Sequence, residues 1–279
     1  MKSSSQPSAS HAARTVQRRR AGVTADERDD LAVEEPLEIR VEGRPVAVTM
    51  RTPGHDEELA AGFLLTEGVI ERRADIVAIA PVPAKQGGGV EPNIVNVTLA
   101  RPEAVDFGRL TRHVFTASSC GLCGKATIAA VHARQPALAP EAGPRLTTDL
   151  LARMPAALAD AQETFQRTGG LHAAGLFAAD GRLLALREDV GRHNAVDKVV
   201  GHLLLGGTFD PAQVVLLVSG RVAFEIVQKA LAARIACIAA ISAPTSLAVD
   251  FARRSGQTLV GFLRDGRMNV YAGADRIQP

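Results

Sequence analysis

Two of the three cysteines in the chain lie in one glycine-rich segment, 118–125 (SSCGLCGK). The Cys-x-x-Cys spacing of Cys120 and Cys123 offers sulfur or redox chemistry. Nearby backbone amides and a positive charge such as Lys125 can lower a cysteine pKa from about 8.5 toward neutrality. The third cysteine, Cys237, lies in an apolar run at 235–240, where a buried thiol is expected. The sequence therefore predicts that the reactive thiolates are Cys120 and Cys123.

Three kinds of site use such a cysteine pair: half of a zinc site, a reversible disulfide and a sulfur carrier. Zinc needs three or four nitrogen or sulfur ligands. His113 and His132 are near in sequence, but they follow no metal-binding repeat. A thioredoxin-like site would have an aromatic neighbour in an early βαβ unit, and this loop has neither. A persulfide carrier needs one exposed thiolate on a mobile loop, which Gly121 and Gly124 permit.

A second candidate site lies at the ends of the strands expected in the C-terminal half. Three segments there are rich in small, hydroxyl or arginine residues and precede expected helices: 188–194 (EDVGRHN), 219–221 (SGR) and 242–246 (SAPTS). Helix N-termini carry free N–H groups and the positive end of the helix dipole. Their convergence on one crevice predicts a phosphate-bearing ligand. The alternative is that Asp189, Ser219 and Ser242 only cap helices.

Other polar residues are weaker candidates. His193, at the start of an expected helix, is the better acid–base candidate, whereas His172 lies within an expected strand and should be structural. The pair at 197–198 (DK) should be solvated or hydrogen-bonded on its helix. Glu225 and Lys229 are four positions apart, a spacing that stabilises a helix by about 0.2–0.5 kcal/mol.

Composition limits the classes of protein to consider. The chain has 279 residues, 46% of them hydrophobic, which is ample for a core. Its net charge is only +2, and it has no Trp and one Tyr, so a nucleic-acid partner is not expected. No apolar run approaches the roughly 18 residues of a membrane span. Three cysteines suit a reducing compartment, so we expect a cytoplasmic protein.

The N-terminal third divides into a tail and a small α+β unit. The first 25 residues hold four arginines and no acid. The apolar segment of an export signal does not follow the arginines. We therefore expect a disordered basic tail over 1–33. Residues 34–112 should form an α+β subdomain: a hairpin over 37–50 turning at 42–43, a helix from about 56 to 67, and strands near 76–79 and 94–99.

Residues 113–279 are predicted to form an α/β domain. A helix over about 149–167, interrupted near its start by Pro155, precedes a hairpin over 171–186. Helices over 193–205, 222–233 and 246–255 then alternate with apolar strands over 214–218, 235–241 and 258–263. A last turn at 265–266 leads into a strand over 268–271. This alternation predicts a central, mostly parallel mixed sheet.

Several of these segments match a known family. They occur in the chain in the order 52–59 (TPGHDEEL), 62–64 (GFL), 118–125 (SSCGLCGK), 188–198 (EDVGRHNAVDK), 219–221 (SGR), 227–229 (VQK) and 242–248 (SAPTSLA). From about residue 34 to its C-terminus, the chain strongly resembles the formate dehydrogenase accessory sulfurtransferases of the FdhD family. The resemblance implies a cytidine-deaminase-like three-layer core for the α/β domain.

The resemblance also implies an activity. A sulfurtransferase of this family takes persulfide sulfur from a cysteine desulfurase. It passes the sulfur to the molybdenum cofactor, Mo-bis(molybdopterin guanine dinucleotide), before that cofactor enters formate dehydrogenase. We expect a cytoplasmic homodimer that binds this cofactor as a substrate and has no structural metal, nucleic-acid partner or membrane association. The alternative is a zinc- or redox-responsive binding module that uses the Cys-x-x-Cys loop.

The resemblance assigns site residues as well. The persulfide carrier of the family falls on Cys120, and the second cysteine falls on Cys123. The cofactor-binding stretch of the family falls on six consecutive residues: Phe262, Leu263, Arg264, Asp265, Gly266 and Arg267. Deaminases with this core need His-x-Glu beside Pro-Cys-x-x-Cys. Here Ala174 follows His172 in place of the glutamate and Ser119 precedes Cys120, which disfavours hydrolytic deamination.

Overall fold

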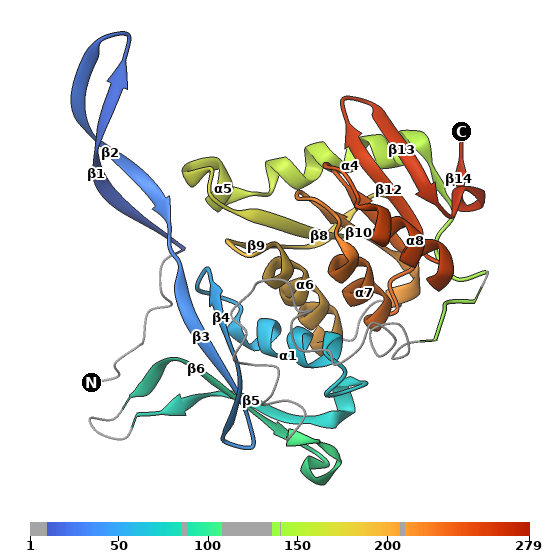
Figure 1. Ribbon diagram of the computed structural model, residues 1–279, viewed down its shortest axis with the longest axis horizontal. Coiled ribbons are helices and arrows are strands. Elements are labelled where there is room, and N and C mark those ends of the chain that lie inside the picture. The colour runs from blue at the N-terminus through green and yellow to red at the C-terminus, as the bar shows by residue number, and fades with distance from the viewer. Residues whose placement is uncertain (1–9, 85–88, 108–135, 140, 207–209) are drawn as a thin grey trace.

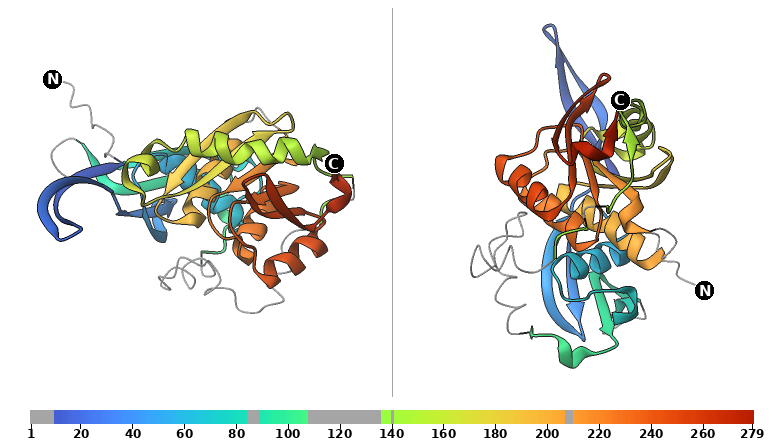
Figure 2. Two further views of the ribbon diagram at one scale, coloured as in Figure 1. Left: turned by 90° about the horizontal axis from the view of Figure 1, so that it is seen from above. Right: turned by 90° about the vertical axis from the view of Figure 1, so that its right-hand side faces the viewer.

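The computed structural model describes residues 10–84, 89–107, 136–139, 141–206 and 210–279. Figure 1 shows a long β-hairpin projecting from a body in which a small N-terminal sheet and a larger C-terminal sheet are joined through helices. The two views of Figure 2 show the same hairpin extending beyond the body. The cysteine loop at 118–125 lies outside the described residues.

The projecting hairpin corrects the prediction of a disordered tail for residues 11–32. Strands β1 (His11–Arg20) and β2 (Val23–Ala32) pair antiparallel along their whole length. The basic strand β1 faces an acidic strand β2, and Arg18 lies 3.1 Å from Glu27 and 3.2 Å from Asp29. Opposite charges on neighbouring strands stabilise the pair of strands. The prediction of disorder was wrong because it considered the arginines of β1 without the acidic residues of β2.

The N-terminal unit is a four-stranded sheet covered by one helix. Its strands are β3 (Glu35–Val41), β4 (Arg44–Arg51), β5 (Ile76–Pro83) and β6 (Val90–Leu99), in the order β4-β3-β6-β5. Leu37, Ile39 and Val41 alternate along β3 and are buried, as expected for a sheet with one covered face. Helix α1 (Asp56–Thr66) begins with three acidic residues, which suit the positive end of the helix dipole. The predicted α+β arrangement of this segment is present.

The larger sheet has six strands in the order β13-β12-β11-β10-β8-β9. The three central strands, β10 (Val214–Val218), β11 (Cys237–Ala240) and β12 (Thr258–Arg264), are parallel. Strands β8 (His172–Ala178) and β13 (Arg267–Ala272) run antiparallel to these, and β9 (Leu183–Asp189) pairs with β8. The predicted mixed α/β sheet is confirmed, whereas its kinship with cytidine deaminases stays a prediction.

Helices cover both faces of this sheet. Along β10, Leu216 belongs to the core shared with α6 (Arg192–Gly206), α7 (Phe224–Ala232) and α8 (Ser246–Ser255). The next residue, Leu217, belongs to the opposite core, under α4 (Thr148–Asp160). Because side chains alternate across a strand, the sheet is the middle of three layers. The seam between N- and C-terminal parts runs through α1 and α6, which lie side by side (Figure 1).

The helix expected over 149–167 is in fact two helices. Pro155 lies inside α4 without interrupting it, because Leu151, Met154 and Leu158 are buried against the sheet and hold the helix in place. The break comes later, before α5 (Glu163–Thr168). In the first turn of α5, the backbone N–H groups of Thr164 and Phe165 donate to the carboxylate of Glu188, at 3.0 Å and 2.7 Å. This carboxylate therefore caps the start of the second helix.

The remaining elements are short. Strands β7 (Leu146–Thr147) and β14 (Ile277–Gln278) form a small parallel pair. Single 3₁₀ turns occur at η1 (Arg73–Asp75), η2 (Pro102–Ala104), η3 (Pro211–Gln213) and η4 (Ala274–Arg276). Among the described residues, no helix combines the length and apolar character needed to span a bilayer.

Helices α1 and α6 meet through two glycines. A Cβ atom built on Gly62 would lie 1.8 Å from the backbone oxygen of Asp197, and one built on Gly201 would lie 1.8 Å from the backbone oxygen of Glu58. Neither position tolerates a side chain, because the obstructing atoms belong to the backbone. The glycine of the GFL segment therefore serves close helix packing, which fixes the two parts of the chain relative to each other.

Candidate functional site

Two of the loops that the sequence predicted to meet lie together at the carboxyl edge of the six-stranded sheet. The loop after β10, the loop after β11 and the end of β12 are joined by backbone hydrogen bonds. The distances are 3.1 Å from Val222 N–H to the Ala243 oxygen, 2.9 Å from Thr245 N–H to the Val222 oxygen, and 3.1 Å from Phe262 N–H to the Ser242 oxygen. Two of the three predicted loops therefore adjoin each other and the predicted cofactor-binding stretch.

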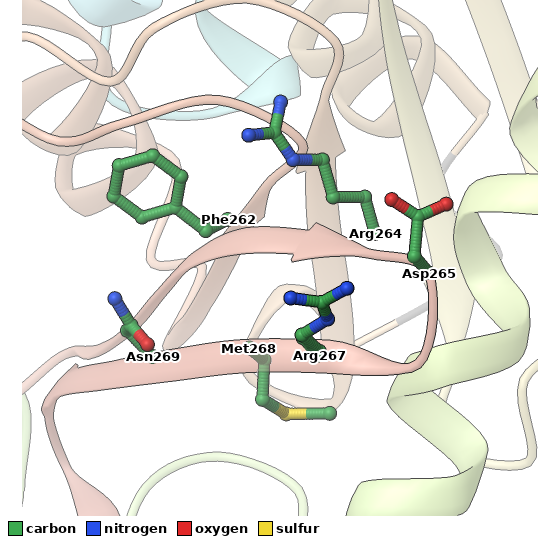
Figure 3. Close-up of a pocket in the computed structure, with 6 residues that line it drawn as sticks. All are labelled: Phe262, Arg264, Asp265, Arg267, Met268 and Asn269. Carbon is green, nitrogen blue, oxygen red and sulfur yellow. The ribbon is translucent and has the colours of Figure 1, made fainter.

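The turn from β12 to β13 borders a hollow of about 410 Å³. Its lining consists of Phe262, Arg264, Asp265, Arg267, Met268 and Asn269. Figure 3 shows the side chains of Phe262, Arg264 and Arg267 on one side of the hairpin and Met268 on the other. The two guanidinium groups and one aromatic ring suit a ligand that carries both a negative charge and a flat ring.

Six residues of this stretch were predicted as cofactor-binding, and four of them line the hollow. The side chain of Leu263 does not, because it is fully buried in the core beneath α4. Gly266 supplies the turn, with a φ of 69° that follows a φ of 52° at Asp265. Alternation along β12 thus divides the stretch into residues that face the hollow and residues that hold the hairpin in place.

The loop at 188–194 is held by a buried carboxylate, Asp189. Its oxygens accept hydrogen bonds from Thr52 N–H at 3.2 Å, from Gly191 N–H at 2.8 Å and from the Asn194 side-chain amide at 2.9 Å. The Lys198 ammonium lies 2.7 Å from the same carboxylate, and both side chains are buried. Asp189 therefore does more than cap a helix, since it joins the N-terminal TPGHDEEL segment to the EDVGRHN loop.

A second buried ion pair connects α6 and α7. The Lys229 ammonium lies 2.8 Å from the Asp197 carboxylate and 2.9 Å from the hydroxyl of Thr66 on α1. Burial disfavours its charge, but the Asp197 and Glu67 carboxylates outweigh this effect and raise the pKa of Lys229. The i, i+4 pair expected between Glu225 and Lys229 does not form, because Lys229 is buried and is paired with Asp197.

The two histidines differ in their surroundings. His193 is buried at the start of α6. His172 begins β8 and lies beside the loop after β10, where a Cβ on Gly220 would be 3.2 Å from its Nδ1. Ala174, two residues further along β8, is fully buried. His172 therefore adjoins one of the predicted loops, which its place in a strand did not indicate.

Cys237 is a core residue, as the sequence predicted. It begins β11 and is buried among the side chains beneath α4. Burial raises the pKa of its thiol to about 12. A thiol of this kind stays protonated at neutral pH and is a poor nucleophile. The predicted sites of sulfur chemistry, Cys120 and Cys123, lie outside the described residues.

Comparison with known proteins identifies relatives over nearly the whole chain. The model of the FdhD/NarQ family matches residues 32–278. The chain is 52% identical to "Sulfur carrier protein FdhD" of Streptomyces coelicolor, covering 95% of this chain and 94% of that protein. It is 50% identical to the protein of the same name from Mycobacterium tuberculosis, covering 94% and 98% respectively.

A solved structure agrees with these relatives. A crystal structure from Desulfotalea psychrophila, described as a formate dehydrogenase accessory protein, superposes with a TM-score of 0.74. It is 26% identical in sequence, and the match covers 96% of this chain and 99% of that one. Sequence and fold lead to the same assignment, and the chain belongs to the FdhD/NarQ family.

Proposed function

We propose that the chain is a sulfur carrier that receives its sulfur on Cys120. The Cys120 thiolate attacks the terminal sulfur of a persulfide on a cysteine desulfurase. The sulfur–sulfur bond of the donor breaks, the donor cysteine leaves as a thiolate, and a persulfide forms on Cys120. The single observation that carries this proposal is the SSCGLCGK segment in a chain about half identical to proteins named sulfur carriers.

The proposed acceptor is the molybdenum cofactor in its bis(molybdopterin guanine dinucleotide) form, bound as a substrate before it enters formate dehydrogenase. The guanidinium groups of Arg264 and Arg267 support this proposal, because they border the hollow and charge-assisted hydrogen bonds favour phosphate. Phe262 offers a ring beside them, with the Arg264 guanidinium 5.8 Å from its centroid. We further propose a homodimer that acts in the cytoplasm.

The direct test is the mass of the intact protein after incubation with a cysteine desulfurase and cysteine. We expect the wild-type chain to gain one sulfur atom, which a reducing thiol removes, and Cys120→Ala to gain none at that position. The alternative, a zinc- or redox-responsive module, predicts about one zinc per chain by elemental analysis and no sulfur adduct. If the protein contains zinc and gains no sulfur, the sulfur-carrier proposal is wrong and the alternative holds.

A second test addresses the hollow at the β12–β13 turn. Replacing both Arg264 and Arg267 by Ala should weaken the binding of GDP, a partial mimic of the cofactor, by about 1.5–3 kcal/mol per lost charged hydrogen bond. Both side chains are exposed, so the fold should be unchanged. Calorimetric titration measures the effect, with Arg182→Ala, on the exposed β8–β9 turn, as the matched control. If the double variant binds GDP as tightly as the wild type, the β12–β13 turn has only a structural role.

A further inference from the structure

A group of one histidine and two arginines lies on the same edge of the sheet, away from the β12–β13 turn. It consists of His172 at the start of β8, Arg192 at the start of α6, and Arg221 in the loop after β10. Gly220 lies between them, because a Cβ at this position would be 3.2 Å from His172 Nδ1 and 3.9 Å from Arg192 Cβ. A side chain at this position would therefore narrow the space beside His172 and Arg192, and Arg221 is the next residue in the same loop.

The charge of this group is not balanced by the nearby acids. Asp189 is paired with Lys198, and Glu188 accepts the N–H groups of α5. Within the described ranges, Arg192 and Arg221 make no ion pair with a carboxylate, and the Arg192 Nε is buried without a hydrogen-bond partner. Burial and the charges of Arg192 and Arg221 lower the pKa of His172, with Asp189 opposing them. The group therefore has an excess of positive charge and an unused donor.

The position of the group relative to the hollow limits what it can bind. In the sheet order, β11 separates the loop after β10 from the end of β12, and His172 on β8 is one strand further away. The N-terminus of α6, a helix of 15 residues, adds the positive end of a helix dipole to the group. An extended nucleotide suits such an arrangement, with its ring near Phe262 and its phosphates between the two groups of arginines.

We propose that His172, Arg192 and Arg221 form a diphosphate subsite, distinct from the hollow at the β12–β13 turn. It holds the diphosphate of a nucleotide ligand from one side, while Arg264 and Arg267 reach the same phosphates from the other and Phe262 contacts the ring. The identity of that nucleotide rests on the proposed function, since the molybdenum cofactor contains diphosphate links. The subsite itself requires only two adjacent phosphate groups.

Calorimetric titration with inorganic pyrophosphate tests the subsite without a guanine ring or a sulfur donor. Wild-type protein should bind pyrophosphate, and Arg221→Gln should weaken both pyrophosphate and GDP by about tenfold or more, as expected for a lost charged hydrogen bond. Arg221 is exposed, so this variant should keep its fold. Arg182→Gln, at the opposite edge of the sheet, is the matched control and should bind both ligands like the wild type.

The outcomes separate this inference from the proposed function. Pyrophosphate binding that depends on Arg221, without GDP binding, would support the subsite and contradict the nucleotide-binding part of the proposed function. GDP binding that Arg221→Gln leaves unchanged would overturn the subsite and leave the proposed function standing. Absence of pyrophosphate binding to the wild-type protein would also overturn it. Gly220→Ala, whose methyl group would narrow the space beside His172, should reduce pyrophosphate binding with both arginines present.

Discussion

Cells whose only copy of this protein carries Cys120→Ala are expected to lose formate dehydrogenase activity, while the variant accumulates as folded protein. The reason is chemical: without the Cys120 thiolate, no persulfide forms at the proposed carrier position. The measurements are formate oxidation in cell extracts and the amount of variant in the soluble fraction. The expected loss is nearly complete, because Cys120 is the proposed carrier and the buried Cys237 cannot replace it.

The matched control is Cys237→Ala, which removes a cysteine that the structure buries and whose thiol pKa is about 12. This variant should support normal activity once its stability is taken into account. Cys123→Ala should reduce activity as well, since the second cysteine belongs to the same segment. Normal formate oxidation with Cys120→Ala would refute the assignment of the carrier. A loss of activity in folded Cys237→Ala would mean that the core cysteine has a chemical role.

The second large effect is expected at the contact between α1 and α6. Gly201→Ala places a methyl carbon 1.8 Å from the backbone oxygen of Glu58 and 2.6 Å from its carbonyl carbon. Backbone atoms of a packed helix cannot move aside, so the two helices must separate. Overpacking of this kind costs about 3 kcal/mol or more, which exceeds the gain of about 1 kcal/mol from replacing glycine by alanine in a helix.

Urea unfolding measures this effect through the free energy of unfolding. Gly206→Ala is the matched control, because Gly206 ends the same helix and a Cβ there has no atom within 4 Å. The control should be as stable as the wild type or slightly more stable. A Gly201→Ala variant with wild-type stability would show that the two helices can shift apart without cost.

The sequence predicted the C-terminal sheet well for a physical reason. Strands covered on both faces, such as β10, are short and wholly apolar, and the helices between them have a clear amphipathic pattern. The hairpin of β8 and β9 was recognised from its Asp-Gly turn. These signals are local, so a single sequence contains them in full.

The failures concern contacts between distant segments. The N-terminal hairpin depends on charges that meet only when the chain folds back on itself, as Arg18 does with Asp29. The partner of Lys229 is Asp197 on another helix, and no local spacing rule identifies it. Within the candidate site, the stretch 262–267 was placed by family resemblance. Only the alternation seen in the structure separates Leu263 from the residues that line the hollow.

The buried ion pairs at the seam have a consequence for cooperativity. Lys198 donates to the backbone oxygen of Thr52 at 2.8 Å, and Lys229 donates to Thr66, so charges of the C-terminal part are solvated by groups of the N-terminal part. Separating the two parts would leave buried charges with fewer partners, which is strongly unfavourable. We therefore expect that neither part folds by itself and that the body of the protein loses its structure in one transition.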